Sequence, residues 1–331
     1  MPSQKDILAA NALIDDSNAP KVAVFAGGTA GLGKLTIRAL VDTGISIKIY
    51  MAGRKSSEEP SKALIKELQA INSKAEIIWT EADISLLQDT KRICEEIKKK
   101  ESHVDLLFLS AGYAPFKGRE VTSEGLEITQ VLEYYSRMLF ILQLLPLLEK
   151  SQAPRVISIL AGGLEGAKMD VDDLNLEKPG NFGGAKAQGH FGAMNTLFMD
   201  RLATEHPEVT FIHSWPGWVN TGNVKRSTDP NSMAGWLFWL IVEPLVSMLS
   251  MKDETAAQRF LFLSTSAAFG GKGVPWTGEK GVNTRETTED GLFLTNYKAH
   301  WTPNVKNVGK LREQARQKLW DKTQEVLKPY L

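Results

Sequence analysis

Apolar residues along this chain follow two alternating patterns, and each predicts a type of secondary structure. Short continuous apolar runs such as KVAVFA at 21–26 predict buried strands, whereas apolar residues spaced three or four positions apart predict amphipathic helices. Further strands are predicted at 45–53, 75–83, 103–112, 154–160 and 209–215, with a last strand near Lys280–Asn283. Helices are predicted at 31–44, 58–72, 123–150, 184–205 and 308–328. One more helix is predicted to begin at a candidate capping box of Ser85 and Gln88 and to end at Lys100.

The alternation of strands and helices indicates the fold class. It is typical of an α/β protein with a doubly wound, mainly parallel sheet and helices on both faces. No internal repeat, low-complexity tract or linker divides the 331 residues, so one domain over 1–331 is expected. The apolar, irregular segment 222–275 interrupts the pattern, and we interpret it as a substrate-lid insertion.

The composition indicates which partners and which cellular compartment to expect. Lys plus Arg and Asp plus Glu both number 39, which gives no reason to expect nucleic acid as a partner. The single cysteine, Cys94, cannot form an intramolecular disulfide and fits a reducing compartment. Because the N-terminus lacks the basic start and apolar run of a signal peptide, a cytoplasmic protein is expected.

One apolar segment, 233–251, could be mistaken for a membrane span. Glu243 and Pro244 interrupt it, and the uninterrupted part is far shorter than the roughly 20 residues that a span needs. It is therefore predicted to be a buried or lid-forming helix, with peripheral membrane contact or an oligomer surface as the alternative.

A glycine-rich turn follows the first predicted strand and opens the first predicted helix. The sequence AGGTAGLG at 26–33 places Gly27, Gly31 and Gly33 in a G-x-x-x-G-x-G spacing. Glycines permit a tight turn and close approach of a phosphate, while the helix N-terminus supplies unpaired N–H groups and the positive end of its dipole. In this strand–turn–helix context, the turn predicts a dinucleotide-binding site.

Four motifs, in order along the chain, resemble those of the short-chain dehydrogenase/reductase family. The glycine turn fits its T-G-x-x-x-G-x-G pattern, with Ala26 in place of the threonine. The pair AD at 82–83 is similar to the family's adenine-contacting aspartate, and LSAG at 109–112 to its N-N-A-G motif. WPGWVNTG at 215–222 resembles the family segment that grips the nicotinamide carboxamide.

The resemblance implies a Rossmann fold with strand order 3-2-1-4-5-6-7 and a nicotinamide dinucleotide cofactor. DDLNLEK at 172–178 and LLPLLEKS at 144–151 resemble the retinol-dehydrogenase-like branch, and GGLEG resembles a divergent fungal branch found in specialised metabolism. The cofactor positions that it implies are Gly27, Thr29, Gly31, Leu32, Gly33, Asp83, Ile84, Ala111, Gly112, Pro216, Gly217, Val219 and Thr221.

The end of the second predicted strand favours NADP(H) over NAD. An NAD site has a carboxylate about 20 residues after the glycines, which binds the ribose hydroxyls. Here the chain reads YMAGRKSSEE, with Arg54 and Lys55 where that carboxylate would lie. Cationic side chains at this place would pair with a 2′-phosphate, although a solvated basic turn is the alternative.

The catalytic residues that the resemblance implies are all replaced. The family uses a tyrosine as proton donor, a lysine four residues later that lowers the tyrosine pKa, a serine that orients the carbonyl, and an asparagine. The corresponding positions are Gln188, Gly192, Ala161 and Glu133. A shifted register would not restore the tyrosine, because no tyrosine lies between residues 136 and 296.

Four side chains are candidates for a replacement acid. His190 lies two residues from Gln188 and could titrate near neutrality, but it projects about 200° away on the predicted helix and could equally be structural. Glu133, Tyr134 and Arg137 lie at or near the lost asparagine, and Glu133 and Arg137 have ion-pair spacing. The five histidines lack metal-ligand spacing and no G-x-S-x-G motif occurs, so neither a metal nor a serine hydrolase is expected.

The sequence thus predicts an NADP(H)-dependent reductase with an atypical active site that acts on an apolar small molecule, in specialised metabolism. A non-redox cyclase or isomerase, and an inactive cofactor-binding protein, remain open. The resemblance also implies a possible homodimer in which the helices at 123–150 and 184–205 pair between copies, while the helix at 308–328 could cap the fold or join a partner.

Overall fold

A computed structural model describes residues 1–113, 118–217 and 251–331. The strands are β1 (Val22–Ala26), β2 (Ile47–Gly53), β3 (Ala75–Glu81), β4 (Leu106–Leu109), β5 (Arg155–Ile159), β6 (Thr210–Ser214) and β7 (Leu292–Thr295). The helices are α1 (Gln4–Asn11), α2 (Gly31–Asp42), α3 (Glu58–Ile71), α4 (Leu87–Lys100), α5 (Ile128–Gln130), α6 (Ser136–Leu148), α7 (Gly184–Glu205), α10 (Asp253–Thr265) and α11 (Val305–Leu327). Shorter helical turns are η1 (Lys55–Ser57), η2 (Val131–Tyr135) and η3 (Lys328–Tyr330).

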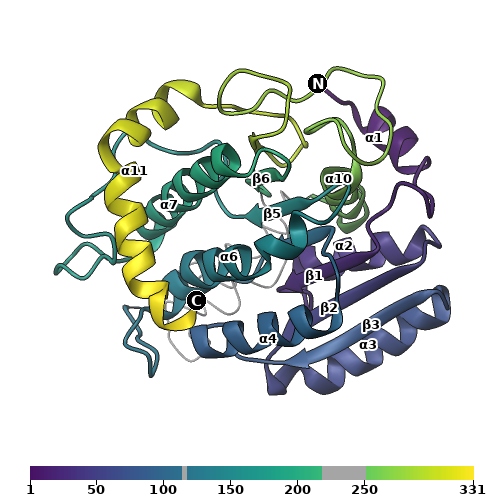
Figure 1. Cartoon of the computed structure of the whole chain (residues 1–331), viewed down its shortest axis with the longest axis horizontal. Helices are drawn as coiled ribbons and strands as arrows, with labels where there is room; N and C mark the ends of the chain where they lie inside the picture. Colours follow the sequence, from purple (N-terminus) through teal and green to yellow (C-terminus); the bar gives the residue numbers. More distant parts are fainter. Residues whose placement is uncertain (114–117, 218–250) are drawn as a thin grey trace, which may run out of the picture.

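The seven strands form one sheet in the order β3-β2-β1-β4-β5-β6-β7, and every pairing is parallel. This confirms the predicted doubly wound fold and its strand order. Consecutive residues of one strand belong to the cores on opposite faces, as Val24 and Phe25 of β1 do. Helices α1, α2, α3 and α10 cover one face, and α4, α6, α7 and α11 cover the other (Figure 1).

The predicted last strand near Lys280–Asn283 is wrong, since the seventh strand is β7, twelve residues further on. A strand covered by helices on both faces needs an uninterrupted apolar run. The sequence LFLT of β7 provides one, and all four of its residues are buried. The glycine at 281 instead donates its amide hydrogen to the carbonyl of Ala268 in a loop.

The predicted capping box before α4 is also wrong. Ser85 donates its hydroxyl to Asp83, and the helix begins two residues later. The carboxylate of Glu124 caps α4 by accepting from the backbone amides of Leu87, at 2.7 Å, and Gln88, at 3.0 Å. A cap from 36 residues further along the chain leaves no local signal in the sequence.

The long helix predicted at 123–150 is interrupted. It begins at Ile128 and passes through a π-helical turn, η2, before α6 continues to Leu148. A π-turn inserts an extra residue and re-aims the side chains on it, and such turns occur often at functional sites. Residues 128–148 are long and apolar enough to span a membrane, but 83% of the most apolar window is buried inside the protein, as in a core helix.

The remaining predictions concern the helices at 184–205 and 308–328 and the lid insertion at 222–275. The helix at 184–205 is confirmed as α7, and the predicted C-terminal helix is α11, which begins three residues earlier. Most of the predicted lid insertion at 222–275, including 233–250, lies outside the described residues, and its described end contains α10.

Candidate active site

The glycine turn between β1 and α2 has the geometry of a phosphate cradle. A Cβ on Gly27, whose φ is +106°, would lie 2.6 Å from the amide nitrogen of Ala111 on the neighbouring strand end. A Cβ on Gly33 would lie 2.2 Å from the carbonyl oxygen of Gly27. Because α2 begins at Gly31 without a side-chain cap, its first N–H groups point out of the helix end and are available to an anion.

A surface pocket of about 400 Å³ lies beside this turn, at the carboxyl ends of β2 and β3. Its charged lining residues are the cations Arg54, Lys55 and Arg92 and the carboxylates Glu81, Asp83 and Asp89. In the described part of the chain, neither the Arg54 nor the Lys55 side chain forms a hydrogen bond or an ion pair. The carboxylate of Asp83 accepts from the amide and the hydroxyl of Ser85, which fixes the loop after β3. Of the three cations in this lining, Arg92 pairs with Asp89 and Glu96, whereas Arg54 and Lys55 are unpaired among the described residues.

The remaining cofactor positions predicted from the sequence lie along the same carboxyl edge. Thr29 lies close to the end of β2, because a Cβ on Gly53 would meet its methyl group at 2.7 Å. Leu32 and Ile84 are buried, and Gly217 follows β6 with a φ of +68°. Pro216 precedes it and is half-buried, while Val219 and Thr221 lie outside the described residues.

A buried carboxyl contacts a half-buried amide at the position that the sequence predicts for the proton donor. The side-chain amide of Gln188, near the start of α7, donates a hydrogen bond of 2.6 Å to the carboxylate of Glu133 on the π-turn. Glu133 is 2% exposed, and burial raises the pKa of its carboxyl to about 7, although Gln188 and the charge of Arg137 oppose the rise. Gly112 is required here, since a Cβ on it would lie 2.7 Å from Cγ of Glu133.

Arg137 connects the helix that carries Glu133 to the ends of β4 and β5. Its guanidinium donates to the carbonyl of Ala111 after β4, at 2.7 Å, and to the hydroxyl of Ser158 and the carbonyl of Ile159 on β5, at 2.8 and 2.9 Å. Burial lowers the pKa of Arg137 to about 10, so the group stays charged at neutral pH. The expected ion pair between Glu133 and Arg137 is not among the ion pairs of the described residues, and Arg137 influences Glu133 through its field.

Asn195 of α7 completes the support of the π-turn. Its amide donates to the backbone carbonyl of Glu133 at 2.7 Å, and its carbonyl oxygen accepts from Ser158 at 2.9 Å. The π-turn is thereby joined to α7 and to β5, which fixes the position of Glu133 relative to Gln188.

The other two candidate acids are directed elsewhere. The hydroxyl of Tyr134 forms a hydrogen bond of 2.6 Å with Thr323 of α11, and burial raises its pKa well above the ordinary value. The imidazole of His190 contacts the carbonyl oxygen of Leu174 at 3.1 Å, and burial lowers its pKa. The structure brings Glu133 and Gln188 together and leaves Tyr134 and His190 in structural contacts.

The two small residues at the expected serine and lysine positions pack against each other. A Cβ on Gly192 of α7 would lie 2.8 Å from Cβ of Ala161, which follows β5. No side chain larger than hydrogen fits at 192 without movement of α7 or of the loop. The approach of the helix therefore leaves no room for a lysine at the position where the family pattern predicts one.

A buried polar chain holds the loop that carries Ala161. The amide of Ala161 donates to Nε2 of His213 on β6 at 3.2 Å, which leaves the proton of the neutral imidazole on Nδ1. Nδ1 contacts the Thr196 hydroxyl at 2.7 Å, and that hydroxyl donates to the carboxylate of Glu165 at 2.5 Å. Burial lowers the pKa of His213 to about 3 and raises that of Glu165.

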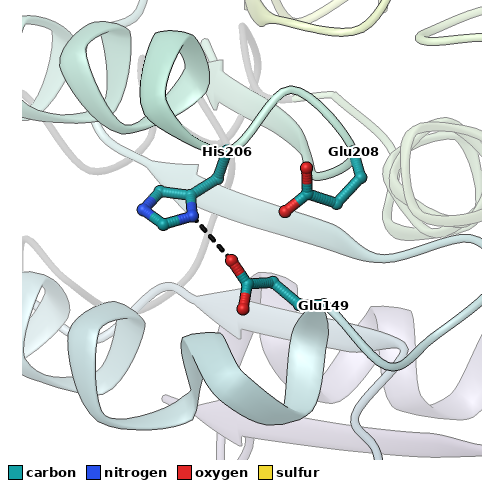
Figure 2. A group of neighbouring side chains, drawn as sticks. All are labelled: Glu149, His206 and Glu208. Atoms are coloured by element: carbon teal, nitrogen blue, oxygen red, sulfur yellow. Dashed lines mark hydrogen bonds and ion pairs between the residues drawn. The ribbon is translucent and has the colours of Figure 1, made fainter.

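One group away from this edge has metal-ligand atoms close together. Glu149, His206 and Glu208 offer ligand atoms within 4.8 Å of one another, and Figure 2 shows Glu149 and His206 pointing toward each other. The contact between them, at 2.7 Å, joins the C-terminal ends of α6 and α7. These helices run antiparallel to the strands, so the group lies at the amino edge of the sheet, opposite the glycine turn.

Comparisons with known proteins agree with this geometry. Residues 21–167 match the profile of short chain dehydrogenases. The chain is 35% identical to Oxidoreductase AN1596 of Emericella nidulans over 92% of each protein. It is 30% identical to Short-chain dehydrogenase/reductase SAT2 of Stachybotrys chartarum over 82% of this chain and 80% of that protein. The chain belongs to the short-chain dehydrogenase/reductase family. Its fold is also that of the Pseudomonas aeruginosa RhlG/NADP active-site complex, with a TM-score of 0.54 at 19% identity over 79% of this chain and 93% of that one.

In this short-chain dehydrogenase/reductase, several residues around the site were not predicted from the sequence. Asn195, Ser158, Thr196 and Glu165 all support the active-site edge through contacts between residues 31 to 62 positions apart. Buried polar residues within apolar segments, such as Asn195 and Thr196 in the middle of α7, are the signal that could have indicated them, because buried polar groups need partners.

Proposed function

We propose that this chain is an NADP(H)-dependent reductase in which Glu133 replaces the usual tyrosine as proton donor. The observation that carries the proposal is the Gln188–Glu133 hydrogen bond, because it places a carboxyl with a pKa of about 7 beside the tyrosine position. A general acid is most effective when its pKa lies near the working pH. The names of the relatives, which are oxidoreductases, support a redox reaction.

The residues at the carboxyl edge fit a nicotinamide dinucleotide. The Gly27–Gly33 turn and the open N-terminus of α2 would hold the pyrophosphate, and Gly112 and Gly217 would line the path toward the nicotinamide. Arg54 and Lys55 would hold the 2′-phosphate of NADP(H), since they are unpaired within the described residues and no carboxylate replaces them at the end of β2. When bound, the reduced nicotinamide supplies a hydride.

The protein's own part in the reaction is to deliver a proton and to exclude water. Protonated Glu133 gives its proton to the oxygen of a substrate carbonyl, so that one hydride and one proton together convert the carbonyl to an alcohol. The amide of Gln188 orients the carboxyl, and Asn195 and Arg137 keep the π-turn fixed to β4 and β5. Burial of Glu133 lowers the local dielectric and strengthens these interactions.

An apolar substrate fits the surroundings of the site. Leu164, three residues after Ala161, is 56% exposed at this edge, and the sequence at 233–251 is rich in apolar and tryptophan residues. The fungal oxidoreductases among the relatives support a place in specialised metabolism. An exposed apolar side chain beside polar catalytic groups is typical of small-molecule pockets.

The test is NADPH consumption across a panel of apolar ketones and aldehydes, measured for the natural chain and for Glu133→Gln. We expect turnover that depends on both NADPH and Glu133. Turnover that is equal in the variant would reject Glu133 as the acid, and a panel without any turnover would reject the reductase.

A non-redox isomerase or cyclase is the second candidate, because a carboxyl that titrates near neutrality can both donate and accept a proton without any hydride. Product analysis with a polycyclic precursor separates the two. An isomerase forms product without NADPH consumption, whereas a reductase yields a product that carries two more hydrogens.

A further inference from the structure

The helix α6 is largely apolar and is buried almost all round, so both the side that faces the sheet and the outer side must be covered. Of its thirteen residues, only Leu142 and Pro146 are not buried. A helix that is apolar all round is stable only when its outer side is covered as well as the side that faces the sheet. Figure 1 shows α11 running along the outer side of α7 and ending beside α6.

The contact between α11 and α7 is built from charged and aromatic groups. Arg312 of α11 makes a two-pronged ion pair with Asp200 of α7, at 2.8 and 2.6 Å, and Asp200 is 1% exposed. Trp320 stacks on Phe198 with ring centroids 4.9 Å apart, and the guanidinium of Arg201 lies 3.9 Å from the centre of the Trp320 ring. These contacts fix both the register and the orientation of α11 on α7.

The end of α11 covers the π-turn and α6. Thr323 bonds to Tyr134, next to Glu133, and Gln143 of α6 donates to the carbonyl of Tyr330 at 2.7 Å. Leu319 and Leu327 are buried in the same core cluster as the residues of α6 and α7. The outer α6–α7 face, defined by Tyr134, Gln143, Phe198 and Asp200, is thus in contact with α11 or with η3 at each of these four residues.

We propose that α11 closes the outer α6–α7 face against a second copy of the chain. The resemblance of the sequence implied that these two helices pair between copies, but the same face cannot pack on α11 and on a partner's helices at once. A dimer through this face would first require α11 to leave, which would break the Arg312–Asp200 ion pair and leave the buried carboxylate with only the Thr284 hydroxyl, at 2.8 Å, and Arg285, at 3.5 Å. This inference does not depend on the proposed reductase activity.

Zero-length carbodiimide cross-linking tests the closure on the natural chain. Nζ of Lys318 on α11 lies 3.1 Å from the carboxylate of Asp172, in the loop before α7, and both side chains are exposed. Unlabelled chains are mixed with ¹⁵N-labelled chains at a protein concentration low enough for copies to dissociate and exchange. The mixture is then concentrated and treated with the carbodiimide. Mass spectrometry distinguishes a Lys318–Asp172 product within one chain from a product between chains.

We expect every cross-linked Lys318–Asp172 peptide pair to have both peptides labelled or both peptides unlabelled. The same result is expected if copies associate through another surface, because α11 would still be docked on α7 of its own chain. A mixed pair would show that α11 exchanges between copies, and the absence of the pair would show that α11 does not dock on α7; either result overturns the proposal. Lys318→Gln removes the reactive amine and identifies the product.

Discussion

The amide nitrogen of Gln188 lies 2.6 Å from a carboxylate oxygen of Glu133, and this contact joins the two positions that the sequence predicts for the family's tyrosine and asparagine. The two substitutions are therefore one structural unit. Gln188 cannot act as an acid, but it satisfies one oxygen of a carboxyl that is otherwise almost without solvent. In the proposed reductase, the acid function has moved from α7 to the π-turn.

Replacement of Glu133 by glutamine should abolish the chemistry while the fold and the cofactor affinity persist. The two side chains have the same shape, and the new amide can still contact Gln188, but it cannot release a proton. We expect the rate of carbonyl reduction to fall by about 10²–10⁴-fold, the range for loss of a general acid. Stopped-flow NADPH oxidation measures the rate, and NADPH titration checks that binding is unchanged.

Glu67→Gln is the matched control for that substitution. Glu67 is a surface carboxylate on α3 that pairs with Arg38, on the sheet face opposite α7. The control should retain the natural rate. If it lost activity to the same extent as Glu133→Gln, the effect could not be assigned to proton transfer.

The raised pKa of Glu133 predicts how rate and stability change with pH. Since reduction needs the protonated carboxyl, the rate should fall as pH rises through about 7. In the unfolded chain Glu133 has its ordinary pKa of 4.5. Between pH 4.5 and about 7, Glu133 is therefore protonated in the folded protein but ionised in the unfolded chain. The protonated Glu133 therefore stabilises the fold fully below pH 4.5, and this contribution is lost as pH rises through about 7.

Thermal unfolding between about pH 5 and pH 8 measures this contribution. The difference in unfolding temperature between Glu133→Gln and the natural chain should shift in favour of the variant as pH increases. A difference that is constant over this interval would contradict a carboxyl that titrates near neutrality.

The basic pair at the end of β2 predicts the choice of cofactor. Arg54→Asp removes a cation that faces the pocket beside Asp83 and introduces the carboxylate typical of NAD sites. We expect NADPH binding to weaken by at least about tenfold more than NADH binding, because loss of a charge-assisted phosphate contact costs about 1.5–3 kcal/mol. Lys66→Asp, on the exposed side of α3, makes the same charge change away from the pocket and should affect the two cofactors equally. Equal losses with Arg54→Asp would refute the role of this residue.

Most of the sheet could be predicted because its strands are short apolar runs, each followed by a turn or a helix. The strand order followed from the family resemblance. The seventh strand and the cap of α4 could not be predicted in the same way. For β7, the sequence analysis placed the strand at 280–283, and the burial of the run LFLT within the sheet shows its actual position. For α4, the cap comes from Glu124, and contacts between distant residues leave no periodic signal.

In the candidate site, too, some features could be predicted from the sequence and others could not. Glu133 and Gln188 were found by position alone, but the sequence could not show that they meet, because a π-turn changes where the side chains of that helix point. For Tyr134 and His190, no sequence pattern distinguishes catalysis from packing, since that depends on Thr323 and on the carbonyl of Leu174.

The chain of hydrogen bonds from Ala161 to Glu165 predicts the effect of a mutation that adds no bulk. Thr196→Val keeps the shape of the side chain but leaves Nδ1 of His213 without a hydrogen-bond partner, while Oε1 of Glu165 keeps only the amide of Gly163, at 3.0 Å. We expect the free energy of unfolding to fall by about 1–3 kcal/mol per unsatisfied buried group. Thr36→Val is the matched control, because the hydroxyl of this buried threonine only returns to the carbonyl of Leu32 on its own helix. Equal effects of the two substitutions in urea unfolding would show that the chain of hydrogen bonds has no stabilising role.

Two glycines on α7 predict opposite effects of the same substitution. Gly189 is exposed, and a Cβ added there would have no neighbouring atom within 4 Å, so Gly189→Ala should stabilise the helix by about 1 kcal/mol through its higher helix propensity. Gly192→Ala introduces a methyl group 2.8 Å from Cβ of Ala161, and overpacking of this kind costs about 1–3 kcal/mol. Gly192→Lys should destabilise the protein further and should not restore a catalytic lysine, because the helix already occupies the space. Urea unfolding of the three variants measures the differences, and stabilisation by Gly192→Ala would contradict the close approach of α7 to the loop after β5.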